Sequence, residues 1–227
     1  MKVDSKNIIV CGDIHGDWKA LNKLIKDKQP ETILQCGDFG YWPNLKQARL
    51  YDVSTGKFIT EETKVENGYT KIYFCDGNHE DHDSLRKLVS TEVYPNVFYM
   101  KRGSVLTLPD KINVLFLGGA SSIDRRGRTP GYDWFSEEIL TEKDIENLPD
   151  CKIDIVVSHT CPNEFKPVIN DRFENDLSRV ILSYILDKYN PCLWYFSHWH
   201  VYKTGRFADT KWICLNMSNK LGWWEYL

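Results

Sequence analysis

The chain has 227 residues, of which 42% are hydrophobic, and a formal net charge of −3. This length suits one domain with a buried core, and we expect a single domain over residues 1–227. The negative charge excludes a global basic field for nucleic-acid binding, although a local basic groove stays open.

Localisation is predicted from what the sequence lacks. The polar N-terminus has no apolar signal-peptide stretch, and no apolar run is long enough to span a bilayer, so no membrane partner is expected. The seven cysteines are odd in number and form no CxxC pair, which is typical of reduced thiols. We therefore expect a cytoplasmic protein.

The first half of the chain alternates short apolar runs with amphipathic segments. Strands are predicted at residues 7–11, 32–36 and 70–75. Asp17 is a suitable N-cap for a helix to about Gln29, because apolar side chains recur on one face. These side chains are Trp18, Leu21, Leu24 and Ile25. A turn signal at 54–57 predicts a small inserted hairpin in the polar stretch that ends near Gly68, and a second helix is predicted over 81–89.

The second half of the chain adds paired strands to this alternation. Strands are predicted at 97–108 and 112–117, which pair, at 154–158 and 191–196, and at 203–207 and 211–216, which close the fold as an antiparallel pair. Helices are predicted near 141–147 and over 176–189, with a polar loop at 121–130. Strands that alternate with helices and then pair favour a mixed α/β sandwich.

Five of these strands end in polar residues of one chemical kind. The segments are Gly12-Asp13-Ile14-His15-Gly16, Gly37-Asp38, Gly77-Asn78-His79-Glu80, Ser158-His159 and Ser197-His198-Trp199-His200. Of the six His residues, only His82 lies outside them. Residues two apart in an extended segment share a face, so Asp13 and His15 could face one point, as could His198 and His200. Sites in α/β sheets gather at the carboxyl ends of strands, which predicts that all five segments meet.

The chemistry of these segments indicates a metal site. The candidate ligands are Asp13, His15, Asp38, Asn78, His159, His198 and His200. Carboxylate and imidazole without thiolate suit divalent ions of intermediate hardness, and we expect manganese ahead of iron or zinc. The set is too large for one tetrahedral ion, so two ions that share a carboxylate fit better. Two ions about 3.5–4 Å apart can clamp the attacking and leaving oxygens of a phosphoryl displacement.

The motifs GDIHG, GD, GNHE, a lone His and SHWH together resemble the calcineurin-like metallophosphoesterase superfamily, and the segment 118–126 resembles its small bacterial and phage members. The one departure is Ser197, where the family has glycine; serine is small, so the ligands should survive. The resemblance implies an α/β fold, a four-layer αββα sandwich of two mixed sheets. It also implies two ligand sets with Asp38 as the bridge. One set is Asp13, His15, Asp38 and His200, and the other is Asp38, Asn78, His159 and His198.

The resemblance further implies a mechanism, in which a hydroxide that bridges two metal ions attacks phosphorus and His79 protonates the leaving oxygen. His79 could instead only pack or orient a ligand. We expect a metal-dependent phosphatase or phosphodiesterase that acts on small-molecule or nucleotide phosphomonoesters or diesters. Arg125 and Arg128, in the loop after 112–117, are predicted to bind the phosphate, with a solvated basic loop as the alternative.

Two other functions stay open. A nuclease or a protein Ser/Thr phosphatase would use the same chemistry, although GD is followed here by Phe39-Gly40-Tyr41-Trp42 where protein phosphatases have GDxVDRG. A non-catalytic scaffold would keep the fold without the metals, but the complete ligand set and His79 disfavour it.

Overall fold

Two six-stranded mixed sheets form the centre of the computed structural model, which describes residues 7–43, 48–52, 57–61, 65–169 and 176–227. The first sheet has the order β14-β1-β2-β5-β7-β6 and the second the order β12-β13-β11-β10-β9-β8. The strands of the first are β1 (Ile8–Cys11), β2 (Thr32–Gln35), β5 (Lys71–Phe74), β6 (Glu92–Tyr94), β7 (Val97–Tyr99) and β14 (Trp224–Tyr226). Those of the second are β8 (Val105–Leu108), β9 (Ile112–Leu117), β10 (Ile155–Ser158), β11 (Leu193–Phe196), β12 (Lys203–Phe207) and β13 (Thr210–Cys214).

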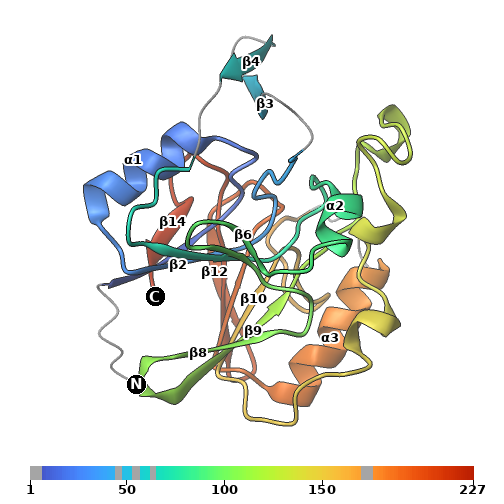
Figure 1. The fold of residues 1–227 in the computed structure, drawn as a ribbon. Coiled ribbons are helices and arrows are strands. Elements are labelled where there is room, and N and C mark those ends of the chain that lie inside the picture. Colours follow the sequence, from blue (N-terminus) through green and yellow to red (C-terminus); the bar gives the residue numbers. More distant parts are fainter. Residues whose placement is uncertain (1–6, 44–47, 53–56, 62–64, 170–175) are drawn as a thin grey trace.

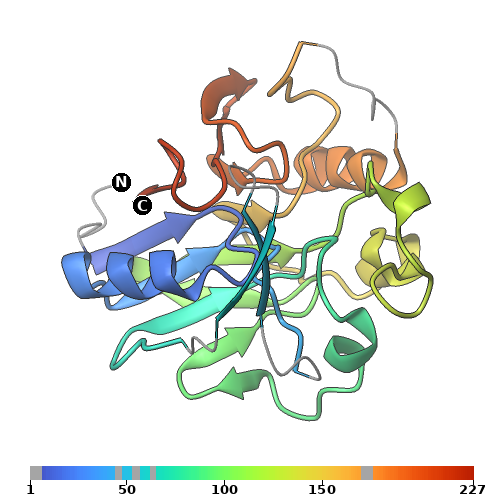
Figure 2. The same ribbon diagram turned by 90° about the horizontal axis from the view of Figure 1, so that it is seen from above.

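Helices cover the outer faces of both sheets (Figures 1 and 2). They are α1 (Trp18–Lys28), the short α2 (His82–Arg86) and α3 (Leu177–Tyr189). Single 3-10 turns lie at η2 (Pro109–Lys111), η3 (Arg125–Gly127), η4 (Ser136–Glu138) and η5 (Glu142–Ile145). The expected four-layer αββα sandwich is confirmed. Within the described residues, no helix has the length and apolar character needed to span a bilayer.

Alternation along each strand divides the core into three layers of side chains, because neighbouring side chains point to opposite faces. In β1, Ile9 packs with Leu21 of α1, whereas Val10 packs between the sheets with Phe116 of β9. The third layer lies between the second sheet and α3, where Ile181 and Ile185 are buried. The strand β1 is therefore buried on both faces, and the loop at its carboxyl end starts from a fixed base.

Most of the predicted elements are confirmed. Asp17 caps α1 by accepting a hydrogen bond from Ala20, and Asp176 caps α3 through Arg179. The predicted hairpin is formed by β3 (Ala48–Asp52) and β4 (Lys57–Glu61). This hairpin lies apart from both sheets in Figure 1. Its predicted turn lies largely outside the described residues.

Two predicted elements are wrong. The segment 97–108 is two strands, because a turn at Lys101–Ser104, with Gly103 at φ +84°, carries the chain from the first sheet to the second. Of these two strands, β8 pairs with β9, as predicted for the whole segment, whereas β7 pairs with β5 in the first sheet. The helix predicted near 141–147 is the single turn η5, which Thr141 and Asp144 close as a capping box.

Candidate metal centre

The five polar segments leave strands of both sheets that run parallel to their neighbours. Within the first sheet, β1, β2 and β5 are parallel, and within the second, β10 runs parallel to β9 and β11. Backbone hydrogen bonds join the loops: Ile14 and His15 donate to the carbonyl of Asp38, and Ser197 donates to that of His159. The candidate ligands are therefore assembled from two sheets, as the sequence predicted.

A first group of ligand atoms surrounds the buried carboxylate of Asp13. Oδ2 of Asp13 lies 3.0 Å from Nε2 of His200 and 3.9 Å from Nε2 of His15. The two imidazole nitrogens are 3.3 Å apart. Oδ2 of Asp38 lies 3.6 Å from Nε2 of His15.

A second group lies on the other side of Asp38. Its Oδ2 is 3.5 Å from Nε2 of His159. Oδ1 of Asn78 lies 2.9 Å from the same His159 nitrogen and 3.0 Å from Nδ1 of His198. Nδ1 of His159 donates to the carbonyl of Cys36 at 2.8 Å, so Nε2 is the ring nitrogen that faces Asp38 and Asn78.

These residues fit divalent metal ions. Ligands of a common ion, at bonds of about 2.0–2.2 Å, lie roughly 3–3.5 Å apart, close to the spacings within both groups. The buried Oδ2 of Asp13 makes no well-aligned hydrogen bond, and its near neighbours are the imidazole nitrogens of His200 and His15, so this oxygen is suited to share a cation with them. Ligand atoms of Asp13, His15 and His200 lie within 4.8 Å of one another, as do those of Asp13, Asp38 and His159.

The surrounding imidazoles favour the ionised form of the buried Asp38 carboxylate. Burial acts to raise the pKa of Asp38, but His159 and other imidazoles hold it well below its ordinary value. Burial acts to lower the pKa of His159, but the carboxylates of Asp38 and Asp13 raise it to about 9. Burial lowers the pKa of His198 to about 3, so this imidazole is a neutral ligand donor.

Four of the candidate ligands adopt the left-handed backbone conformation. The φ angles are +50° at His15, +52° at Asp38, +70° at His198 and +49° at His200. Side chains other than glycine rarely adopt this left-handed region, and such strain persists where surrounding structure fixes it. The expected extended geometry is therefore wrong, and His198 and His200 do not share a face, because His200 contacts Asp13 whereas His198 contacts Asn78. Asp13 and His15 do face one point, as predicted, with Oδ2 and Nε2 3.9 Å apart.

Close backbone approach explains two motif glycines. A Cβ at Gly37 would come within 2.8 Å of three His159 ring and side-chain atoms, and a Cβ at Gly77 within 2.0 Å of Asp38 Oδ1. Ser197 fits where the family has glycine, because its hydroxyl donates to the carbonyl of Cys36 at 2.8 Å. The serine thus joins the same acceptor as His159.

The sequence did not reveal two buried residues that hold the loops. Glu80 accepts backbone N–H bonds from Phe39, Gly40 and Tyr41, which fixes the loop after Asp38. Gln35 donates to the carbonyls of Gly12 and Gly37 and so ties two ligand loops together. Glu80 is part of the GNHE motif, which was the available signal for it, whereas nothing in the sequence marks Gln35.

His79 lies beside the ligands without belonging to either group. Its ring is edge-on to that of His15, with centroids 5.3 Å apart, and its backbone N–H donates to Asp38 Oδ1 at 2.7 Å. Nη2 of Arg128 lies 3.4 Å from Nδ1 of His79. A guanidinium can only donate, so this Nδ1 accepts and the ring proton of neutral His79 is on Nε2.

The two predicted phosphate-binding arginines are placed differently. Arg128 is almost buried and donates to Asn78, Ser122, Asp124, Asp133 and Glu138. Arg125 is exposed and stacks on the ring of Trp134 at 4.2 Å. The structure therefore brings Arg128 to His79 but leaves Arg125 to face solvent.

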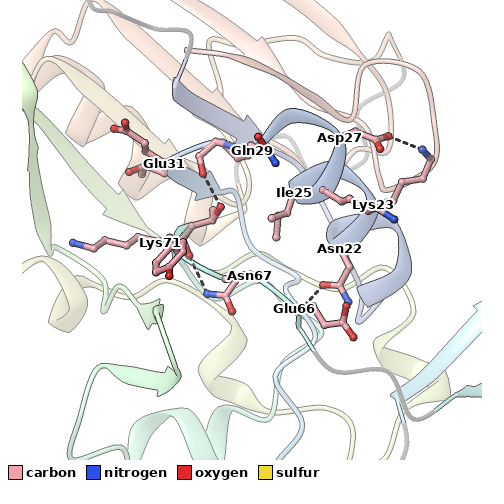
Figure 3. A pocket seen from close by; sticks show the side chains of 15 residues that line it. Asn22, Lys23, Ile25, Asp27, Gln29, Glu31, Glu66, Asn67 and Lys71 are labelled. Atoms are coloured by element: carbon pink, nitrogen blue, oxygen red, sulfur yellow. Dashed lines mark hydrogen bonds and ion pairs between the residues drawn. The ribbon is translucent and has the colours of Figure 1, made fainter.

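A separate hollow of about 1110 Å³ lies beside α1 and the segment 66–71 (Figure 3). Asn22 accepts the backbone N–H of Glu66 across it, and Lys23 pairs with Asp27 at its rim. None of the candidate ligands lines this hollow, and its charges are mixed.

Comparison with known proteins agrees with the fold and the motifs. The family model for calcineurin-like phosphoesterases matches residues 6–202. TT1561 of Thermus thermophilus is 15% identical over 92% of this chain and 88% of that one, with a TM-score of 0.51. A second solved structure is 15% identical over 92% of this chain and 90% of its own, with a TM-score of 0.55. No curated protein matches the sequence.

At this identity the solved structures establish the fold alone, and the family assignment comes from the match over most of the chain. The described metal-ligand groups agree with that assignment. The chain belongs to the calcineurin-like phosphoesterase family and is a metal-dependent phosphoesterase.

Proposed function

We propose that this enzyme hydrolyses small-molecule or nucleotide phosphomonoesters or diesters at a centre of two divalent metal ions. The observation that carries the proposal is the position of Asp38 Oδ2, which is 3.6 Å from His15 and 3.5 Å from His159. One oxygen thus belongs to both ligand groups. Asp13, His15, Asp38 and His200 would hold one ion, and Asp38, Asn78, His159 and His198 the other.

The bound ions would supply positive charge to the phosphoryl oxygens and a water molecule that ionises near neutral pH. Oxygen and imidazole donors without thiolate favour manganese, with iron and zinc as alternatives. All seven cysteines are free, which supports a cytoplasmic location with reducing conditions.

His79 is the proposed general acid. Arg128 occupies its Nδ1, so the proton on Nε2 is the one available to the leaving oxygen. The backbone N–H of His79 donates to Oδ1 of Asp38, which ties this residue to the shared carboxylate.

Arg125 is the proposed phosphate-binding residue, because its guanidinium is exposed while Trp134 holds its plane. A planar fork of this kind matches two oxygens of a phosphate. Arg128 donates to protein groups and is better suited to hold Asn78 and His79 than to bind substrate.

The experiment that tests the proposed function is an assay of metal-stripped enzyme with manganese added back. Nitrophenyl monoesters, nitrophenyl diesters, nucleotides, a phosphopeptide and an oligonucleotide would be compared. We expect manganese-dependent turnover that is fastest on the small esters or nucleotides. Turnover confined to the phosphopeptide or oligonucleotide would contradict the substrate class, and no turnover with any metal would contradict catalysis.

A further inference from the structure

Glu138 places a buried carboxylate behind the metal centre. It is 1% exposed, and four donors surround it. Oε1 accepts from the Ser122 backbone at 3.1 Å and from the indole of Trp134 at 2.9 Å. Oε2 accepts from the Ser122 hydroxyl at 2.9 Å and from Arg128 at 3.3 Å. None of these four donors is a candidate metal ligand. Glu138 can therefore affect the position of the ligands only through Ser122, Arg128 and Trp134.

The Ser122 hydroxyl links Glu138 to Asn78. A hydroxyl has one hydrogen, and here that hydrogen is directed to the carboxylate of Glu138. Its lone pairs then accept from Nδ2 of Asn78 and Nη2 of Arg128, each at 2.9 Å. The amide nitrogen of Asn78 is thereby fixed, and its oxygen is left to face His159 and His198.

Arg128 links the same carboxylate to His79. Its Nη2 donates to Ser122 and approaches Nδ1 of His79, while both terminal nitrogens lie 3.2 Å from the carbonyl of Asn78. A guanidinium whose orientation is fixed by Glu138 therefore selects the ring tautomer of His79.

The loop that carries these groups is closed at its base. Ala120 donates to the Glu138 carbonyl at 2.9 Å, and Arg102 donates to the carbonyl of Glu138 at 3.3 Å. The buried Arg102 is itself paired with Asp76 at 2.6 Å. These bonds hold the backbone of Glu138 in place at the base of the loop 120–138.

We propose that Glu138 is a positioning residue that acts through Ser122 on the amide of Asn78 and through Arg128 on the tautomer of His79. The inference rests on the proposed function, in which Asn78 is a metal ligand and His79 the general acid. A carboxylate is required, because both of its oxygens accept from donors. An amide nitrogen would face the Ser122 hydroxyl and Arg128 in one orientation, and the Ser122 backbone N–H and the Trp134 indole in the other.

The first test uses metal-free protein and nitrogen-15 NMR, so it does not depend on catalysis. In wild type we expect slow solvent exchange of the Asn78 side-chain amide and a His79 ring protonated on Nε2. Ser122→Ala should speed that exchange at least tenfold, Ser122→Thr should restore it, and Glu138→Gln should mix the His79 tautomers. Glu137→Gln, the exposed neighbour in η4, is the matched control and should change neither signal.

The second test is calorimetric titration of the same proteins with manganese. We expect Ser122→Ala and Glu138→Gln to weaken one of two binding events by roughly 10–100-fold, the usual effect of losing a ligand's supporting partner, with the other event unchanged. Unaltered NMR signals in both variants would overturn the inference, as would equal weakening of both events. A wild type that binds fewer than two ions, with the NMR changes present, would overturn the proposed dinuclear function and leave the positioning role intact.

Discussion

Oδ2 of Asp38 lies 3.5 Å from Nε2 of His159, although Asp38 follows a strand of the first sheet and His159 follows a strand of the second. The contact joins the carboxyl ends of β2 and β10. The metal centre therefore depends on how the two sheets pack, and the core between them holds the ligands in register.

Replacement of Asp38 by Asn should lower turnover more than loss of any other single ligand. A neutral amide oxygen binds two cations poorly, and Asp38 is the residue proposed to contact both. Metal analysis and kinetics of Asp38→Asn, beside Asn78→Ala and His200→Ala, would measure this. Two ions per chain with near-normal turnover would show that Asp38 is not the bridge.

Replacement of His79 by Ala should leave both metal ions bound and slow turnover by roughly 10²–10⁴-fold, the range of general-acid catalysis. The loss should be smaller for nitrophenyl esters, whose leaving group needs no proton. Rates on matched alkyl and aryl esters would check it. Equal losses on both would argue against proton transfer, and loss of metal would make His79 a ligand or its support.

Replacement by Lys should distinguish the roles of the two loop arginines, Arg125 and Arg128. Arg125→Lys should raise KM with little change in kcat, because a point charge does not reproduce a planar fork on phosphate. Arg128→Lys should lower kcat, because it removes donors to Asn78 and His79. Steady-state kinetics with metals loaded would distinguish them. Normal constants in Arg125→Lys would place substrate binding elsewhere, near Trp42 for example.

Replacement of Glu80 by Gln should lower the free energy of unfolding by about 1–3 kcal/mol, because an amide nitrogen would face backbone N–H donors in a buried place. Urea unfolding of the metal-free protein would measure the change. The exposed Glu146→Gln is the matched control and should unfold as wild type does. An equally stable Glu80→Gln would mean that the loop after Asp38 is held by other contacts.

Asp76 should make the fold sensitive to acid. Burial acts to raise its pKa, but Arg102 and His82 lower the pKa from the ordinary 3.8 to about 2. A depressed pKa contributes stability that is present above pH 3.8 and is lost as pH falls toward 2, here roughly 2–3 kcal/mol. Urea unfolding between about pH 5 and pH 2 should show this loss in wild type and a flatter profile in Asp76→Asn. Parallel profiles would exclude the Asp76–Arg102 pair as the cause.

The sequence predicted the elements whose signals are local. The apolar run at Ile8–Cys11 and the cap at Asp17 each depend on neighbouring residues, and both are found as predicted. The motifs predicted which residues gather, since parallel strands present their carboxyl ends at one edge.

The remaining features depend on contacts between residues far apart in the chain. The strand Trp224–Tyr226 is defined by pairing with β1, and the break within 97–108 is defined by a change of sheet, which β propensity does not register. On α3, Leu177 and Tyr184 are exposed while Leu182 is buried, because packing rather than apolarity selects the face. Glu138 and Gln35 carry no motif, and their roles are visible only through their hydrogen-bond partners.

Anomalous diffraction from crystals of the manganese-loaded enzyme would show directly whether Asp38 bridges two metal ions. We predict two anomalous peaks, one among Asp13, His15 and His200 and one among Asn78, His159 and His198, with a carboxylate oxygen of Asp38 bonded to both. A single peak, or two peaks that do not share Asp38, would contradict it.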